Sequence, residues 1–214
     1  MILGIFDHAF VLNLDIDKDR YTLVDSKLRA IGIVAERISG AFPLEKGPFK
    51  SKGARGCTES HERAVKIAKE RGYKSILIFE DDVIFRNNFL KLWAPLKTKL
   101  SSLDYDLFYF YDWGRCDSGK GGIVNDLFDW TKRQRNIDIL SIKSTLCTHA
   151  YAVNSCFYDK MLTIFAENGG VGKTVDRLFD AANARIYAPS INLAGQEGGV
   201  SRITGQKKAV RWSV

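Results

Sequence analysis

Ile76-Leu77-Ile78-Phe79-Glu80-Asp81-Asp82 is the stretch of sequence that decides the fold, because four apolar residues run directly into three acidic ones. Such a continuous apolar run is typical of strands in parallel sheets that helices cover on both faces. In open α/β sheets, ligands bind at the carboxyl ends of the strands. The stretch therefore predicts a central strand over residues 75–79 and puts the three acids where a ligand would bind.

The rest of the chain alternates apolar runs with segments of helical spacing. Further strands are predicted at 10–14, 33–38, 107–111 and 150–153, and helices at 20–32, 57–71, 88–100, 155–167 and 174–184. Residues 39–56 are rich in Gly, Pro and Lys, which favours a mobile loop, and no clear period follows residue 187. We expect a single domain over 1–214 with an α/β fold, in which helices flank a mostly parallel central sheet.

Composition restricts the class of protein. The chain has 214 residues, 45% of them hydrophobic, which suits one globular domain, and none of its apolar runs is long enough to span a bilayer. The N-terminus does not read as an export signal, so a cytoplasmic location is expected. The four cysteines form no Cys-x-x-Cys pair, which gives no indication of a zinc or redox motif.

The formal net charge of +7 favours an anionic partner, which includes nucleic acid, an anionic membrane surface and phosphorylated small molecules. Charge alone does not choose among them. Three acids at the end of a central strand would repel the phosphates of a nucleic acid unless a metal ion sat there. We therefore expect no specific nucleic acid, and we keep peripheral contact with an anionic membrane as compatible with the charge.

Glu80 and Asp82 are the candidate metal ligands. In an extended chain their side chains project to the same side, where two carboxylates repel each other. A divalent cation removes that repulsion, and ligands that are all oxygen favour Mg²⁺ or Mn²⁺. Such a cation can hold a diphosphate and neutralise it as it leaves. The alternative is a solvated acidic turn, but the apolar strand in front of the acids favours a functional site.

The helix predicted to begin near Cys57 would carry Thr58, Ser60 and His61 in its first turn. Free backbone N–H groups and the helix dipole at such a position suit an anion. His61 falls on the apolar face of this helix, and a lone histidine there is more often a hydrogen-bonded structural residue than a catalyst.

Three further polar residues lie at the predicted ends of elements. Asp112 follows the strand at 107–111 and should open onto the same sheet edge as Glu80, while His149 precedes the strand at 150–153. Asp176 opens a late helix, where an aspartate is common for structural reasons alone. Each of the three, taken singly, is more typical of a structural role.

One segment imitates a phosphate-binding P-loop, Gly169-Gly170-Val171-Gly172-Lys173-Thr174. That motif needs a glycine five residues before Gly172, and Glu167 stands there. A small P-loop kinase is therefore a minor alternative, beside a non-catalytic basic protein that binds nucleic acid.

Taken together, these residues resemble glycosyltransferase family 25, which includes bacterial lipopolysaccharide galactosyltransferases and collagen galactosyltransferases. The resemblance covers most of residues 10–85 and is weaker afterwards. It rests on Val11-Leu12-Asn13-Leu14-Asp15, Arg20, Gly56-Cys57, Ser60-His61, Ala64 and the stretch from Ile76 to Asp82. The chain departs from it at Ser39-Gly40-Ala41, where members often have Asp-Gly or Asn-Gly, and it has no histidine after His149.

The resemblance implies a GT-A nucleotide-binding sandwich in which Glu80 to Asp82 stand for an Asp-x-Asp-like motif. It implies a UDP-sugar donor, UDP-galactose or UDP-glucose, and a glycan or glycoprotein acceptor such as a surface or capsid glycan. Asp82 would ligate Mn²⁺ or Mg²⁺, with Glu80 sharing the ion or holding the ribose. The remaining donor-site residues would be Leu12, Asn13, Arg20, Ser60, His61, Asp81 and His149. An inverting reaction needs a general base, for which Asp176 is the first candidate and Asp112 the second.

Overall fold

The computed structural model describes residues 2–111, 137–143, 146–180, 182–200 and 207–208. Within these ranges the helices are Lys18–Ala30 (α1), Lys52–Glu70 (α2), Phe89–Ser101 (α3), Tyr158–Asn168 (α5) and Val175–Asp180 (α6), with a 3-10 turn at Ser155–Phe157 (η1). The strands are His8–Asn13 (β1), Glu36–Ser39 (β2), Ser75–Glu80 (β3), Val83–Phe85 (β4), Leu107–Tyr109 (β5), Ile139–Ile142 (β6), Ala150–Asn154 (β7), Ile186–Pro189 (β8), Ala194–Gln196 (β9), Gly199–Val200 (β10) and Lys207–Lys208 (β11).

Among the described residues, seven strands form the central sheet in the order β2-β1-β3-β7-β5-β8-β6. Strands β2, β1, β3, β5 and β8 all point the same way, while β7 and β6 run antiparallel to their neighbours. The predicted α/β fold with a mostly parallel sheet is confirmed. Because β7 is antiparallel and Ala150 pairs with Phe79, the start of β7 lies at the same sheet edge as the end of β3.

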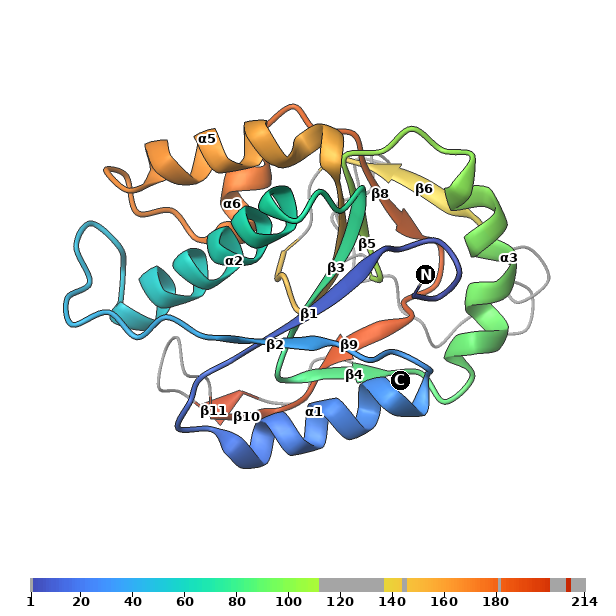
Figure 1. The fold of residues 1–214 in the computed structure, drawn as a ribbon, viewed down its shortest axis with the longest axis horizontal. Helices are drawn as coiled ribbons and strands as arrows, with labels where there is room; N and C mark the ends of the chain where they lie inside the picture. Colours follow the sequence, from blue (N-terminus) through green and yellow to red (C-terminus); the bar gives the residue numbers. More distant parts are fainter. Residues whose placement is uncertain (1, 112–136, 144–145, 181, 201–206, 209–214) are drawn as a thin grey trace.

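Helices cover both faces of this sheet (Figure 1). Alternate residues of β3 enter two separate cores: Leu77 and Phe79 pack toward α1 and α3, and Ile76 and Ile78 pack toward α2, α5 and α6. All four are fully buried. This explains why β3 reads as an unbroken apolar run, since neither face meets water. No helix among the described residues is both long and apolar enough to cross a membrane.

Helix α2 begins five residues earlier than the sequence predicted. Ser51 is its N-cap, and the Ser51 side chain accepts a hydrogen bond from the Ala54 amide at 3.0 Å. Thr58, Ser60 and His61 therefore lie beyond the first turn, so the expectation that free backbone N–H groups at these residues would bind an anion is wrong. The sequence did not predict the helix start at Lys52 because of Gly53 and Gly56, since glycine in a helix interior is less favourable than alanine by about 1 kcal/mol of helix stability.

Position 56 of α2 requires a glycine, because the loop before the helix packs directly against its backbone. A Cβ atom at Gly56 would lie 2.3 Å from the carbonyl oxygen of Ala41. Four residues along, the Ser60 hydroxyl accepts a hydrogen bond from the Ala41 amide at 2.8 Å and donates one to the Gly56 carbonyl at 2.6 Å. Residues 40–43, predicted to lie in a mobile loop, are thus tied to one face of α2.

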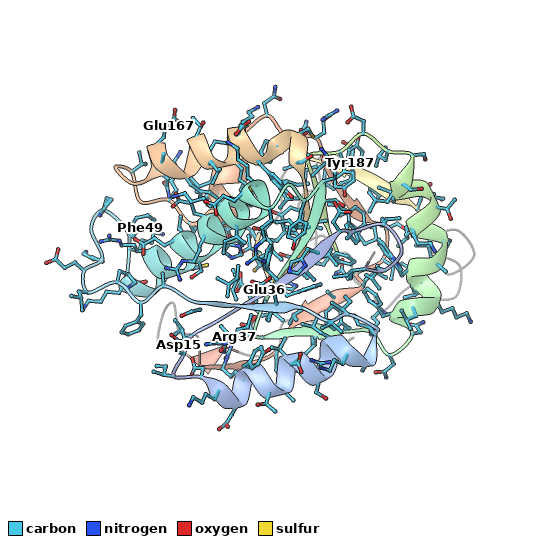
Figure 2. All side chains as sticks on the ribbon, in the orientation of Figure 1. Asp15, Glu36, Arg37, Phe49, Glu167 and Tyr187 are labelled. Carbon is cyan, nitrogen blue, oxygen red and sulfur yellow. The ribbon has the colours of Figure 1, made fainter. Side chains whose placement is uncertain are left out.

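The segment that imitates a P-loop connects α5 to α6. Asn168, at the end of α5, closes this turn by bonding both the amide and the carbonyl of Lys173, each at 2.8 Å. Gly172 has a φ of +73° and lies against Pro48, where a Cβ would come within 2.4 Å of the carbonyl oxygen. Glu167 is exposed on the last turn of α5 (Figure 2). Because a P-loop follows a strand and this turn follows a helix, the structure removes the basis for the kinase alternative.

We predict that Gly56→Ala destabilises the protein by about 1–3 kcal/mol, the usual cost of overpacking. Helix propensity alone would favour alanine by about 1 kcal/mol, so the clash with Ala41 has to outweigh that gain. Urea denaturation followed by circular dichroism measures the difference. Gly170→Ala is the matched control, since the nearest atom to a Cβ there is 3.9 Å away. If Gly56→Ala were as stable as the unmutated chain, the close packing of the loop would be contradicted.

Candidate active site

A pocket opens at the carboxyl ends of β1 and β3. Its lining includes eight of the residues predicted from the sequence: Leu12, Asn13, Arg20, Ser60, His61, Glu80, Asp81 and Asp82. The other lining residues are Leu14, Gly40, Ala41, Phe42, Gly53, Cys57 and Gln196. Residues from four separate parts of the chain therefore converge on the acidic end of β3, as the fold predicts for a ligand site.

The middle acid, Asp81, is held by two residues from the start of the chain. One of its oxygens accepts a hydrogen bond from the Asn13 side-chain amide at 2.8 Å. The other accepts from Arg20 Nε at 3.0 Å and forms a close ion pair with the Arg20 guanidinium. Both oxygens are thus bound by protein donors, and Asp81 fixes the turn between β3 and β4 in place.

Asn13 is itself fixed from the other side. Its side-chain oxygen accepts from Arg37 Nε at 3.0 Å, and its amide also donates to the backbone carbonyl of Asp17 at 3.0 Å. Arg37 also forms an ion pair with Asp15 at 2.5 Å, and both residues are labelled in Figure 2. Hydrogen bonds thus occupy the Asn13 side chain, which makes it a positioning residue of the pocket wall.

Glu80 ends β3, and two side chains reach its Oε1 atom. The Thr148 hydroxyl donates to Oε1 at 2.6 Å, and His61 Nε2 lies 3.4 Å from it. Burial raises the pKa of Glu80, but its interactions with His61 and Thr148 outweigh that effect and bring the pKa well below its ordinary value. Glu80 therefore stays ionised at neutral pH.

Asp82 lies in the turn after β3 and not in the strand. The alternation of side chains along a strand, from which the sequence predicted that Asp82 projects to the same side as Glu80, therefore does not apply to it. It lines the same pocket as Glu80 nevertheless. Its Oδ2 atom accepts from the Gln196 amide at 2.9 Å, while Oδ1 is buried and has no hydrogen-bond donor among the described residues. Burial and the charge of Glu80 raise the pKa of Asp82 to about 7.

Glu80 and Asp82 are the residues that could hold a divalent cation in this pocket. Both line the same pocket, and the charge of Glu80 contributes to the raised pKa of Asp82, as expected for a carboxylate that feels a neighbouring one. A buried carboxylate oxygen without a donor is costly, and a cation would relieve that cost. The hard oxygen atoms of both residues suit Mg²⁺ or Mn²⁺.

His61 and Cys57 face this pocket from the same side of α2, one helical turn apart. His61 is fully buried, and its Nδ1 atom lies 2.8 Å from the hydroxyl of Tyr151. Its Nε2 atom is directed toward Glu80. Ser60 faces the loop at Ala41 and holds the pocket wall.

His149 lies behind the pocket and is not among the residues that line it. It is fully buried, with its ring stacked on Tyr111 at 3.8 Å between centroids. Burial lowers the pKa of His149 to about 3, so the ring is neutral at physiological pH. Its backbone carbonyl accepts from the amide of Glu80 at 3.0 Å, which makes His149 a support for Glu80.

Asp176 is in the first turn of α6, as predicted, and does not line the pocket. Its carboxylate accepts hydrogen bonds from the Thr174 hydroxyl and from the backbone amides of Cys147 and Arg177, at 2.5, 3.2 and 3.0 Å. Since Thr148 follows Cys147 and holds Glu80, Asp176 is linked to the acidic pair by a short stretch of chain. The second candidate base, Asp112, lies outside the described residues.

The sequence reasoning did not select Gln196 or Cys57 as site residues. Gln196 belongs to β9, a three-residue strand that pairs with β4 and brings Gln196 opposite Val83. So short a strand carries no periodic signal. The one available indication was that residues 196–201 fall in an order similar to that of the family. Cys57 could have been found from its spacing to His61, since residues four apart share a helix face.

The chain belongs to glycosyltransferase family 25 (LPS biosynthesis protein), whose family model matches residues 6–178. The enzyme class predicted from the sequence is thereby confirmed at the level of the family. No curated protein matches the chain.

Several solved structures resemble the fold, among them the two that follow. One is A197 from STIV, with 14% identity, a TM-score of 0.48 and coverage of 97% of this chain and 95% of that one. The other is a glycosyltransferase involved in the glycosylation of the major capsid of PBCV-1, with 12% identity, a TM-score of 0.41 and coverage of 75% of this chain and 66% of that one. Likeness at this level carries no information about the chemistry of the pocket.

We predict that Asp82→Asn stabilises the metal-free protein, and more so at pH 8 than at pH 5. The folded-state pKa of Asp82 lies above its unfolded value, so ionising it costs stability as the pH rises from about 4 to 7, and the full cost remains above that range. Asparagine has no such cost and still offers an oxygen to Gln196. Chemical denaturation at the two pH values should show a gain that is larger at pH 8 by at least about 1 kcal/mol, the equivalent of about one pKa unit. An equal effect at both pH values would show that Asp82 is not electrostatically strained.

Proposed function

We propose that this protein transfers a hexose from a UDP-sugar, UDP-galactose or UDP-glucose, to a hydroxyl of a glycan or glycoprotein, with Mn²⁺ or Mg²⁺ in the pocket. The observation that carries the proposal is the buried Oδ1 atom of Asp82, which has no donor among the described residues and shares its pocket with Glu80. The family supports the transferase class. The identity of the nucleotide and the sugar rests on the resemblance.

Glu80 and Asp82 would hold the cation, which would neutralise the diphosphate as it leaves. Asp81 would not bind the donor directly, because Arg20 and Asn13 occupy its oxygens. Arg20 also lies 3.7 Å from Asp82, so it adds a fixed positive charge at the side of the pocket where phosphates would lie. The role of these residues is therefore to keep the acidic turn rigid and correctly placed before the donor enters.

The acceptor hydroxyl must lose a proton as it attacks the sugar, and an inverting enzyme uses a carboxylate for this. We keep Asp176 as the first candidate base and Asp112 as the second. The link from Asp176 through residue 147 to Thr148 and Glu80 supports a location near the reaction, and equally supports a purely positioning role.

The setting of the reaction is proposed on charge alone. A net charge of +7 supports peripheral contact with an anionic membrane, with the cytoplasm as the expected location. The carboxylates in the pocket disfavour nucleic acid as a specific partner, since they would repel its phosphates.

We predict that UDP binding requires Mn²⁺ and that Asp82→Asn weakens it by at least about tenfold, because the substitution removes one charge from a hard-cation ligand while keeping its shape. Isothermal titration calorimetry of UDP with and without Mn²⁺ measures both effects, and GDP tests the choice of nucleotide.

Lys173→Ala is the matched control, since it removes a charge from the turn between α5 and α6, and binding should stay within a few-fold. Equal affinity for UDP with and without the metal in the unmutated protein would contradict the metal-dependent mechanism.

We predict that Asp176→Asn leaves UDP affinity nearly unchanged and lowers turnover by about 10²–10⁴-fold, the usual contribution of a general base. Steady-state kinetics with a hexose acceptor measures turnover, and calorimetry measures donor binding. Thr174→Val separates the roles, because it removes one hydrogen bond to Asp176 but keeps the carboxylate. If Thr174→Val lost as much turnover as Asp176→Asn, Asp176 would be a positioning residue. If Asp112→Asn alone lost turnover, Asp112 would be the base.

A further inference from the structure

Three side chains of different chemistry meet at the inner wall of the pocket. The Cys57 sulfur, a ring nitrogen of His61 and a carboxylate oxygen of Glu80 all lie within 4.8 Å of one another. Cys57 and His61 come from neighbouring turns of α2, and Glu80 comes from the end of β3. This group combines a sulfur, a nitrogen and an oxygen ligand, so its preference among metals differs from that of the Glu80 and Asp82 pair.

His61 is already oriented as a metal ligand would be. Its Nδ1 atom lies 2.8 Å from the Tyr151 hydroxyl, which can fix the tautomer that carries its proton on Nδ1. A cation that enters between His61 and Glu80 would meet the Nε2 lone pair of that tautomer. Nε2 is buried, has no hydrogen-bond partner among the described residues, and lies 3.4 Å from Glu80 Oε1, which is long for a hydrogen bond.

The other two ligands are also held in position. The Thr148 hydroxyl fixes the Glu80 carboxylate at 2.6 Å, as is common for carboxylates that bind metals. Cys57 lies on a helix whose adjacent glycine is packed against Ala41, so its backbone has little room to shift. Both residues line the open pocket, which leaves space for a water molecule as a further ligand.

We propose that Cys57, His61 and Glu80 form a binding site for a thiophilic divalent cation, of which Zn²⁺ is the best match. Zinc takes Cys, His and carboxylate ligands in a tetrahedron, and three protein ligands with one open position is a common arrangement. Thiolate ligands select Zn²⁺ over Mg²⁺ and Mn²⁺. On binding, the Cys57 thiol loses its proton to solvent, while His61 binds in its neutral form.

The site has a consequence for catalysis that rests on the proposed function. Glu80 belongs both to this group and to the pair that would hold Mn²⁺ or Mg²⁺. A Zn²⁺ ion bound to Cys57 and His61 would draw the Glu80 carboxylate toward α2 and place a second positive charge beside Asp82. Zn²⁺ is therefore an inhibitor of the metal-assisted binding of UDP.

Cobalt(II) substitution on the full chain tests the site without any nucleotide, so its outcome is independent of the proposed reaction. Co²⁺ should bind at one equivalent and give the near-ultraviolet band of a cobalt–thiolate bond, and Zn²⁺ should displace it. Cys57→Ser should abolish the band and weaken Zn²⁺ binding by at least about tenfold, since even residues that only orient a ligand cost 10–100-fold. Cys156→Ser is the matched thiol control and should keep the band.

Glu80→Gln provides a second variant, which should weaken Zn²⁺ binding while leaving the thiolate band detectable at higher Co²⁺. Adding Zn²⁺ to the unmutated protein should lower the affinity for UDP with Mn²⁺, and Cys57→Ser should reduce that inhibition. A cobalt spectrum without a thiolate band, or one that survives in Cys57→Ser, would overturn the site. An intact band together with UDP binding that needs no metal would leave this site standing and overturn the proposed function instead.

Discussion

The arrangement of the pocket depends on the binding of Asp81 by Arg20 and Asn13. Both oxygens of Asp81 are bound, by an ion pair and by two further hydrogen bonds. The chain therefore turns sharply after β3, and the acids on either side of Asp81, Glu80 and Asp82, line one pocket. Without that anchor their mutual repulsion would drive them apart into water. Asn13 at the end of β1 and Arg20 in α1 thus hold the acidic turn in place.

The ionised carboxylate of Asp82, buried near that of Glu80, destabilises the folded protein, and the rest of the fold offsets this destabilisation. Burial and the charge of Glu80 raise the pKa of Asp82, and part of that cost is offset by Arg20 at 3.7 Å and by Gln196 at 2.9 Å. Two large apolar cores on either side of the sheet supply the stability that makes such a cost tolerable. Strained charges of this kind cluster at functional sites, which is why the acidic turn is a stronger indication of function than acidity alone.

The sequence predicts the central part of this structure well and its edges poorly. The strand at 75–79 and the acids that follow it come from a local pattern, because a strand buried on both faces leaves an unambiguous apolar run. Asn13 was placed in the site by the family resemblance. The short strands β4, β6 and β9 were not predicted, since three or four residues give no period. The early start of α2 was missed because its glycines serve the packing of another segment, which no local pattern reports.

The spacing Gly56-Cys57-x-x-Ser60-His61 has a physical explanation in the division of α2 into two working faces. Gly56 and Ser60, one turn apart, face the loop at Ala41: the glycine admits it and the serine binds it. Cys57 and His61, also one turn apart, face Glu80. A single helical turn therefore positions both the loop at Ala41, which lines the pocket, and the two side chains that lie close to Glu80. Because the two pairs are offset by one residue, a shift of α2 that improved one face would misplace the other, so the helix position is fixed by the site as much as by the core.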